Sequence, residues 1–370
     1  MLRRTGITHA LFSFCFAVGM TSAAEAQLFF EADAVFLGRN HDGGSSVVSG
    51  QETLTTSNGS FGAEPGYRLG IGMILENFQV DAGFTQVNPW VAESSGMFST
   101  AVNMDGGNPS RLDFNGFLKN AASSAFSGED GEVEAFGPGA TYTNSTRSNY
   151  RDFEINIGSS YATKRWRLSG GFRSVQLDEK NTVGIDGLFT ETPPNQGLSD
   201  TALWNAGATL IAGPGTGFAD GTDLIYSIDT STKNQLNGFQ TTFGVQFIDG
   251  KWVSLEGIAK VGIYRNHMSG QIIETAAGDG AGSSVYQQYL TSSKDGAAFA
   301  GNLGLRAVVG ITDYIDLVGG GEVLFLNGLA LGNDQLDGVR TSTTGLSTYQ
   351  VQNKGSMVGY GGTIGLRIFW

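Results

Sequence analysis

The chain contains few of the residues on which disulfides, metal centres and most catalytic sites depend. Among its 370 residues there is one cysteine, Cys15, and there are three histidines, His9, His41 and His267. Cys15 lies in an apolar stretch near the start, so the sequence after it can form neither a disulfide nor a thiolate metal site. Charged residues make up only 15% and give a net charge of −13, which disfavours nucleic acid as a partner.

Long hydrophobic runs are also missing. The apolar stretch Ala10–Met20 is shorter than the roughly 18 residues that a transmembrane helix needs. It follows Arg3-Arg4 and precedes the small-x-small site Ala24-Glu25-Ala26, which together are the pattern of a secretory signal peptide. We predict that residues 1–26 are this signal and are removed, and that residues 27–370 form one domain.

What the chain has in abundance is alternation of apolar and polar residues, together with 56 glycines. A period of two predicts β-strands, and roughly 9 to 11 residues of strand cross a bilayer at a tilt. Ten segments have this pattern: Leu28–Gly38, Gly66–Leu75, Asn77–Val87, Asn149–Ala162, Arg165–Leu177, Gln235–Ile248, Lys251–Asn266, Ala297–Ile311, Tyr314–Asn327 and Gly355–Trp370. The last one ends on an aromatic residue, which is typical of outer-membrane β-barrels.

Short and long connections alternate between these segments. Four are minimal reversals, at Glu76-Asn77, Thr163-Lys164, Asp249-Gly250 and Thr312-Asp313. The others are long and rich in glycine and serine, and the largest are residues 88–148 and 178–234. In outer-membrane barrels the short turns face the periplasm and the long loops face outward. We therefore expect both ends of the mature chain on the periplasmic side.

Aromatic residues distinguish a membrane wall from a soluble β-sandwich, because only the wall needs them in two belts. One belt lies near the short turns: Phe78, Tyr161, Trp166, Phe247, Trp252, Tyr314 and Trp370. The other lies near the long loops: Phe36, Tyr67, Phe84, Phe172, Phe239, Tyr264 and Tyr360. The sequence predicts an all-β fold, a closed antiparallel transmembrane β-barrel of about ten strands in outer-membrane lipid. Twelve strands are the alternative if a long loop contains another hairpin.

The parity of the strands predicts a charged interior. Twelve charged residues face the lumen in this scheme: Glu31, Asp33, Arg68, Asp81, Glu154, Arg167, Arg173, Glu256, Lys260, Arg306, Glu322 and Arg367. One interpretation is a filled structural barrel, because small barrels are usually filled and buried charges need partners. The other is a narrow porin-like channel for small polar solutes, since inward glycines such as Gly70 and Gly171 leave space. The oligomeric state stays open.

The connections offer no catalytic constellation. An enzyme site near the outer rim needs a histidine with carboxylate or serine partners, and His41 and His267 are single rim histidines by sequence. We expect no enzyme activity, no cofactor and no metal. The acidic stretches Gly128–Glu132 and Asn333–Gly338 lack a complete calcium loop and are interpreted as solvated tips. The residue pattern of Ser110–Phe126 predicts a short helix, which either enters the mouth of the barrel or covers its rim.

Three patches of the sequence resemble the porin-like β-barrel proteins of planctomycetes. Phe29–Arg39 resembles their first strand, Pro65–Gly70 with Phe78–Phe84 resembles the second and third, and Gly365–Trp370 resembles their end. Phe29 departs from the tryptophan expected near that opening. The patches cover about a fifth of the chain, and the resemblance implies an outer-membrane barrel without catalytic residues. The alternative function is that of a surface-loop adhesin or receptor presented on a barrel.

Overall fold

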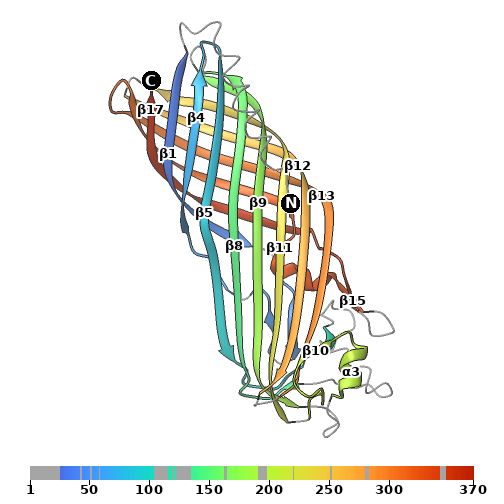
Figure 1. Ribbon diagram of the computed structural model, residues 1–370. Helices are drawn as coiled ribbons and strands as arrows, with labels where there is room; N and C mark the ends of the chain where they lie inside the picture. The colour runs from blue at the N-terminus through green and yellow to red at the C-terminus, as the bar shows by residue number, and fades with distance from the viewer. Residues whose placement is uncertain are drawn as a thin grey trace.

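Ten long antiparallel strands close into a single barrel in the computed structural model of the chain (Figure 1). The wall strands are β1 (Gln27–His41), β4 (Glu64–Ile74), β5 (Phe78–Met97), β8 (Thr141–Ser159), β9 (Trp166–Thr190), β11 (Thr222–Asp249), β12 (Val253–Gly278), β13 (Val285–Gly310), β14 (Ile315–Leu329) and β17 (Gly355–Phe369). Each pairs with the next, and β17 pairs with β1 from Phe29–Phe369 to His41–Met357. The predicted ten-stranded antiparallel barrel is confirmed.

The structure describes residues 26–41, 44–50, 52–57, 59–103, 116–118, 121, 135–161, 165–190, 198–219, 221–250, 252–279, 283–341 and 347–370. The predicted signal, apart from Ala26, the turn at Thr163-Lys164 and the stretch Gly128–Glu132 lie outside these residues. No helix in the described ranges is long and apolar enough to span a membrane.

The outer face of the wall is apolar near the short turns and becomes polar further along each strand. On β11 the outward residues Phe239, Phe243 and Phe247 are 78%, 48% and 58% exposed. Beyond Phe239 the outward positions are Asn237, Gln235 and Lys233. The same change follows Ile263 on β12, where Arg265 and His267 come next. Because charge on the lipid side is unfavourable, the membrane-spanning segments end at this boundary.

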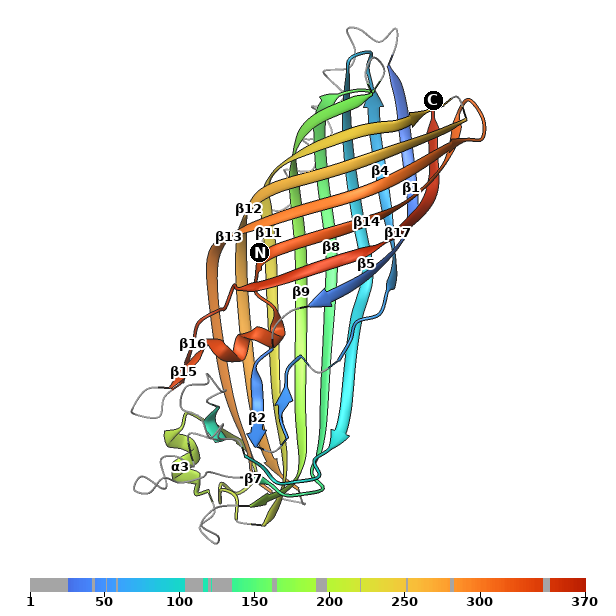
Figure 2. The same ribbon diagram turned by 180° about the vertical axis from the view of Figure 1, so that it is seen from behind.

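Six wall strands continue far past the boundary. β5, β8, β9, β11, β12 and β13 have 19 to 28 residues, whereas β1, β4, β14 and β17 have 11 to 15. Beyond the membrane the long strands form a curved sheet, which Figure 2 shows from its open side. Four closing strands therefore complete the wall only within the membrane.

The long strands show that the predicted loops are too long. Much of residues 88–148 and 178–234 belongs to β5, β8, β9 and β11, and the connection between β12 and β13 is only residues 279–284. The polarity of the alternation reverses beyond the lipid, because a sheet in water buries its apolar residues inward. Because these outer halves of the strands carry glycines and polar outward residues, the sequence analysis predicted them as loops.

The concave face of the extension carries an apolar core. The strands contribute Val183, Ile185, Tyr226 and Ile272, among others. The connections that fold back over this face contribute Val48, Leu54, Phe117, Leu118, Phe136, Leu203 and Leu336. They carry the small elements β2 (Ser46–Gly50), β3 (Leu54–Thr55), β6 (Val102–Asn103), β7 (Ala135–Phe136), α3 (Asp200–Asn205), β10 (Thr209–Ala212), η1 (Gly332–Gly338), β15 (Val339–Thr341) and β16 (Ser347–Tyr349). This core closes the outer end of the molecule.

The two aromatic belts are present with two corrections. Tyr161, predicted in the belt near the short turns, faces inward, because its ring lies 5.2 Å from the guanidinium of Arg167 in the cavity lining. Trp166, Trp252, Tyr314 and Trp370 are exposed at the end of the short turns. Tyr264, predicted in the outer belt, is only 2% exposed and faces inward. Its neighbour Ile263 points into the lipid, and successive side chains of a strand alternate between the two faces.

Candidate lumen site

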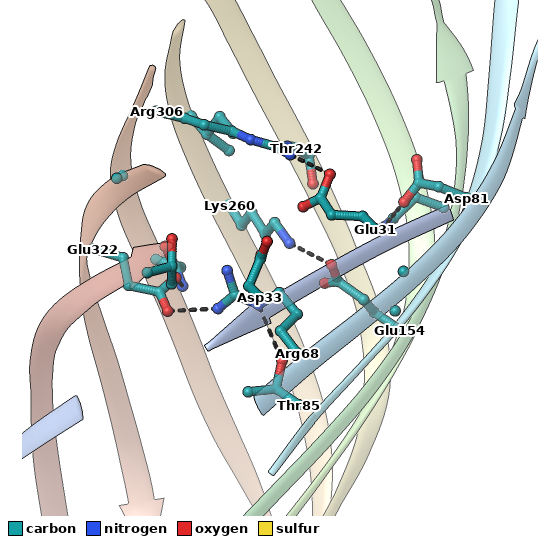
Figure 3. Close-up of a pocket in the computed structure, with 18 of the residues that line it drawn as sticks. Glu31, Asp33, Arg68, Asp81, Thr85, Glu154, Thr242, Lys260, Arg306 and Glu322 are labelled. Atoms are coloured by element: carbon teal, nitrogen blue, oxygen red, sulfur yellow. Dashed lines mark hydrogen bonds and ion pairs between the residues drawn. The ribbon is translucent and has the colours of Figure 1, made fainter. Parts of the chain in front are cut away.

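A polar cavity of about 160 Å³ lies inside the membrane-spanning part of the barrel. Figure 3 shows its charged side chains converging from strands on several sides of the wall. Eleven of the twelve residues that the sequence assigns to the lumen line this cavity: Glu31, Asp33, Arg68, Asp81, Glu154, Arg167, Arg173, Lys260, Arg306, Glu322 and Arg367. The twelfth, Glu256, is 6% exposed and lies beside Arg306 in the β12–β13 register, outside the cavity lining.

The strand register places opposite charges on adjacent strands. Asp33 is paired with Arg68 between β1 and β4, Glu154 with Arg173 between β8 and β9, and Glu31 with Arg367 between β1 and β17. Side chains at directly opposed positions lie within reach of each other on the same face. The strand register alone therefore places acids beside bases on neighbouring strands, in addition to any contacts across the lumen.

Most of these charges form ion pairs. Arg68 Nη2 lies 2.5 Å from Glu322 Oε1, and Lys260 Nζ lies 2.5 Å from Glu154 Oε1, and both pairs are visible in Figure 3. Arg306 and Arg367 both bind Glu31 Oε2, with Arg367 Nε at 2.9 Å. Pairing offsets the large desolvation penalty of a buried charge. The charged side chains of the cavity are therefore largely bound to one another.

One acid of the cavity was missed by the sequence analysis. Asp152 lies in the cavity lining and binds Arg173, with Arg173 Nη2 at 2.6 Å from Asp152 Oδ2. It precedes Glu154 by two positions on β8, so it has the same inward parity and could have been found by counting. With Arg173 held by Asp152, Glu154 is left to Lys260 and Gln240.

An apolar layer lies beyond the cavity, toward the extended ends of the long strands. It consists of inward side chains from nine of the ten wall strands, including Leu37, Leu177, Leu236 and Leu326. Trp90 is fully buried in it and donates from its indole nitrogen to the carbonyl oxygen of Leu37 at 2.7 Å. The cluster thus draws on strands around most of the wall, just beyond the charged residues.

The connection from β14 to β17 forms a plug above this layer. The side-chain amide of Asn234 donates from Nδ2 to the carbonyl oxygen of Ala330 and accepts the N–H of Ala330 at Oδ1, at 2.8 Å each. Thr230 donates to the carbonyl of Gly332 at 2.7 Å, and the N–H of Gly332 donates to Glu179 at 2.8 Å. The prediction that Asn333–Gly338 is a solvated tip is wrong, since η1 is largely buried. Inward side chains of β9, β11 and β12 thus provide the carboxylate, hydroxyl and amide groups that form hydrogen bonds with the backbone of this connection and of the end of β14.

The rim histidines have different surroundings. His267 Nδ1 lies 2.9 Å from Asp295 Oδ1, so a carboxylate is within hydrogen-bond reach of one ring. Both side chains are about half exposed on the outward face, and Arg265 binds the other carboxylate oxygen at 2.8 Å. Arg265 and His267 hold the pKa of Asp295 below its usual value. The His41 side chain lies outside what the structure describes.

The segment predicted as a short helix within Ser110–Phe126 is described only at residues 116–118 and 121. Phe117 and Leu118 are helical there, as is Ala121, and all three side chains are buried in the apolar core of the extension. In the described part of the chain no group of three or more His, Cys, Asp or Glu side chains is arranged to hold a metal ion.

The closed wall, its apolar outer band and its short turns at one end define a transmembrane β-barrel of the outer-membrane type. No protein-family model and no curated sequence matches the chain. Its fold is similar to the outer membrane protease OmpT of Escherichia coli, at TM-score 0.42 and 9% identity, covering 94% of this chain and 98% of that one.

Two transport proteins are similar at lower scores. The toluene transporter TbuX of Ralstonia pickettii has TM-score 0.28 and 7% identity, covering 93% of this chain and 89% of that one. A Pseudomonas aeruginosa FadL homologue has TM-score 0.28 and 8% identity, covering 94% and 90%. At such identities the likeness concerns the fold alone, and neither the protease nor the transporters inform the activity of this chain.

Proposed function

We propose that the protein is a filled structural barrel of the outer membrane, which anchors a folded extracellular sheet and conducts no solute. The apolar layer around Trp90 carries this proposal. It joins side chains from nine wall strands, and a hydrophobic constriction without water blocks ions. Below it the charged side chains are bound to one another, so the cavity offers few free groups for a passing solute.

The placement in the outer membrane belongs to the same proposal. The apolar band, the aromatic belts and the predicted signal over residues 1–26 support it. The resemblance of the first three strands and of the closing strand to planctomycete porin-like barrels also supports it. Sucrose-gradient fractionation of cells that express the full chain should recover the protein with outer-membrane lipid.

Planar-bilayer recording of the refolded barrel tests whether the lumen conducts. We expect no conductance above bare lipid for the wild type, with insertion verified by a heat-dependent shift in gel mobility. A variant with Trp90→Ala, Leu236→Ser and Leu326→Ser replaces part of the apolar layer with space and hydroxyl groups, and it should conduct. Discrete current steps from the wild type would instead establish the narrow channel for small polar solutes.

One observation favours a second function, in which the extracellular end binds an outside partner. The connection between β9 and β11 exposes Trp204 on α3 by 72% and Ile211 on β10 by 53%, and Leu210 is exposed beside it. Large exposed apolar residues on a soluble surface mark interaction sites. An adhesin or receptor should lose partner binding in the double variant Trp204→Ala, Ile211→Ser, while a plain wall protein has no such binding to lose. Deleting residues 88–148 is unsuitable, because it removes parts of β5 and β8.

A further inference from the structure

A single carboxylate is buried in the apolar core of the extracellular extension. Glu274 on β12 is only 1% exposed and lies well beyond Ile263, the last lipid-facing residue of that strand. Its Oε2 accepts the backbone N–H of Phe117 at 2.7 Å, and its Oε1 accepts that of Leu118 at 3.3 Å. The Tyr226 hydroxyl donates to Oε1 at 2.8 Å. Glu274 thus ties the connection between β5 and β8 to the sheet.

The contact requires close approach of the two chains. A side chain at position 116 would place its Cβ 2.2 Å from Glu274 Oε1, so the carboxyl group would have to move away. Phe117, Leu118 and Ala121 are fully buried against the same core. The backbone N–H groups and the apolar side chains of this segment therefore bind the sheet at one place.

No cation balances this carboxylate in the described part of the chain. Tyr226 on β11 is the one titratable group that interacts with it, and Tyr286 on β13 faces the same core further along. The directly opposed inward residues are Ile228 and Gln288. Burial raises the pKa of Glu274 to about 7, and the Phe117 N–H and the Tyr226 hydroxyl only partly counteract that rise.

We propose that Glu274 is a pH-dependent latch, which holds the segment around Phe117 and Leu118 on the sheet and holds it less tightly as the carboxyl group ionises. Release exposes the carboxyl group to water, where it titrates near its ordinary value of 4.5. The held state binds the extra proton, so it is most stable below about pH 4.5. Its stability falls between about pH 4.5 and 7 and is constant above that. The latch is independent of whether the lumen conducts.

Hydrogen–deuterium exchange of the full chain in detergent micelles tests the latch. Protection factors are measured for peptides that contain Phe117 and Leu118, between pH 4.5 and 8. Each pH unit up to about 7 should lower protection about tenfold, and the total loss should be a hundredfold or more. In Glu274→Gln, a neutral isostere, protection should not depend on pH. Flat protection in the wild type, or the wild-type slope in Glu274→Gln, contradicts the proposal.

Two further variants separate latching from folding. Gly116→Ala should leave the segment unprotected at every pH, while the β-sheet circular dichroism and the heat-dependent gel shift stay as in the wild type. Tyr226→Phe removes a hydrogen bond that favours the ionised form, so it should move the midpoint of the transition to higher pH. Wild-type protection in Gly116→Ala, or an unchanged midpoint in Tyr226→Phe, would count against the latch.

Discussion

Arg39 and Glu179 form an ion pair in which neither side chain is exposed to solvent. Arg39 Nη1 lies 2.6 Å from Glu179 Oε2, and Arg39 also donates to the hydroxyl of Ser148. Glu179 Oε1 accepts the N–H of Gly332 at 2.8 Å. The pair therefore joins β1, β9 and the plug at one point inside the barrel.

Breaking this pair should destabilise the protein strongly. Glu179→Gln leaves the Arg39 charge buried without its partner, and such changes cost about 3–5 kcal/mol. Denaturant unfolding of the folded barrel in lipid vesicles measures the free energy. Lys180→Gln is the matched control, because Lys180 pairs with Asp229 at 3.1 Å on the exposed face and such pairs contribute about 1 kcal/mol or less. Equal effects of the two changes would show that the buried pair is not structural.

A charge on the lipid-facing wall should be tolerated only beyond the membrane boundary. Leu303 on β13 is 66% exposed within the apolar band, and Leu303→Arg should lower the free energy of unfolding by about 2–4 kcal/mol. Ser293→Arg has the same outward parity on the polar extension and should have little effect. The same vesicle unfolding experiment compares them. If Ser293→Arg were the more harmful change, the boundary would be misplaced.

Truncating Trp90 should leave a cavity in the apolar layer. Its side chain is fully buried, and Trp90→Ala should cost about 3–5 kcal/mol through lost apolar contacts and the lost hydrogen bond to Leu37. Val91→Ala next to it changes an outward side chain and should fall within about 0.5 kcal/mol of the wild type. Thermal unfolding followed by near-ultraviolet circular dichroism measures both variants.

The plug should make stability depend on pH through Asp334. Burial, followed by the nearby carboxylates of Glu179 and Asp337, raises the pKa of Asp334 to about 7 from 3.8. The folded protein therefore holds a proton that the unfolded chain releases, and its stability should fall as pH rises from about 4 to 7. In a Glu274→Gln background, which removes one further carboxyl group with a raised pKa, Asp334→Asn should reduce this dependence. If adding Asp334→Asn left the slope unchanged, the dependence would belong to other groups.

The membrane-spanning wall could be predicted from sequence because each of its strands has a local signal. Alternation within Gln235–Ile248 or Gly355–Trp370 is repeated in every strand, and the turn at Asp249-Gly250 fixes where one ends. The extension could not be found in the same way. Its strands bury apolar residues inward and show polar ones outside, so the rule of an apolar outer face failed beyond Phe239 and Ile263.

The charged lining could also be predicted, since parity alone assigns Glu31 or Lys260 to the inner face. Which residues bind each other could not, because Lys260 reaches Glu154 across the lumen, 106 positions away in sequence. The apolar layer and the plug depend on the same kind of contact. Nothing in the local sequence indicates that Trp90, Leu236 and Leu326 meet, or that Asn234 binds Ala330.

The ring-closing contact between Glu31 and Arg367 joins residues 336 positions apart. Bringing such distant segments together carries a large entropic cost before any contact compensates for it, and proteins with remote contacts fold slowly. One edge of β1 therefore stays unpaired until β17 has joined the wall. During assembly this free edge is open to pairing with another chain.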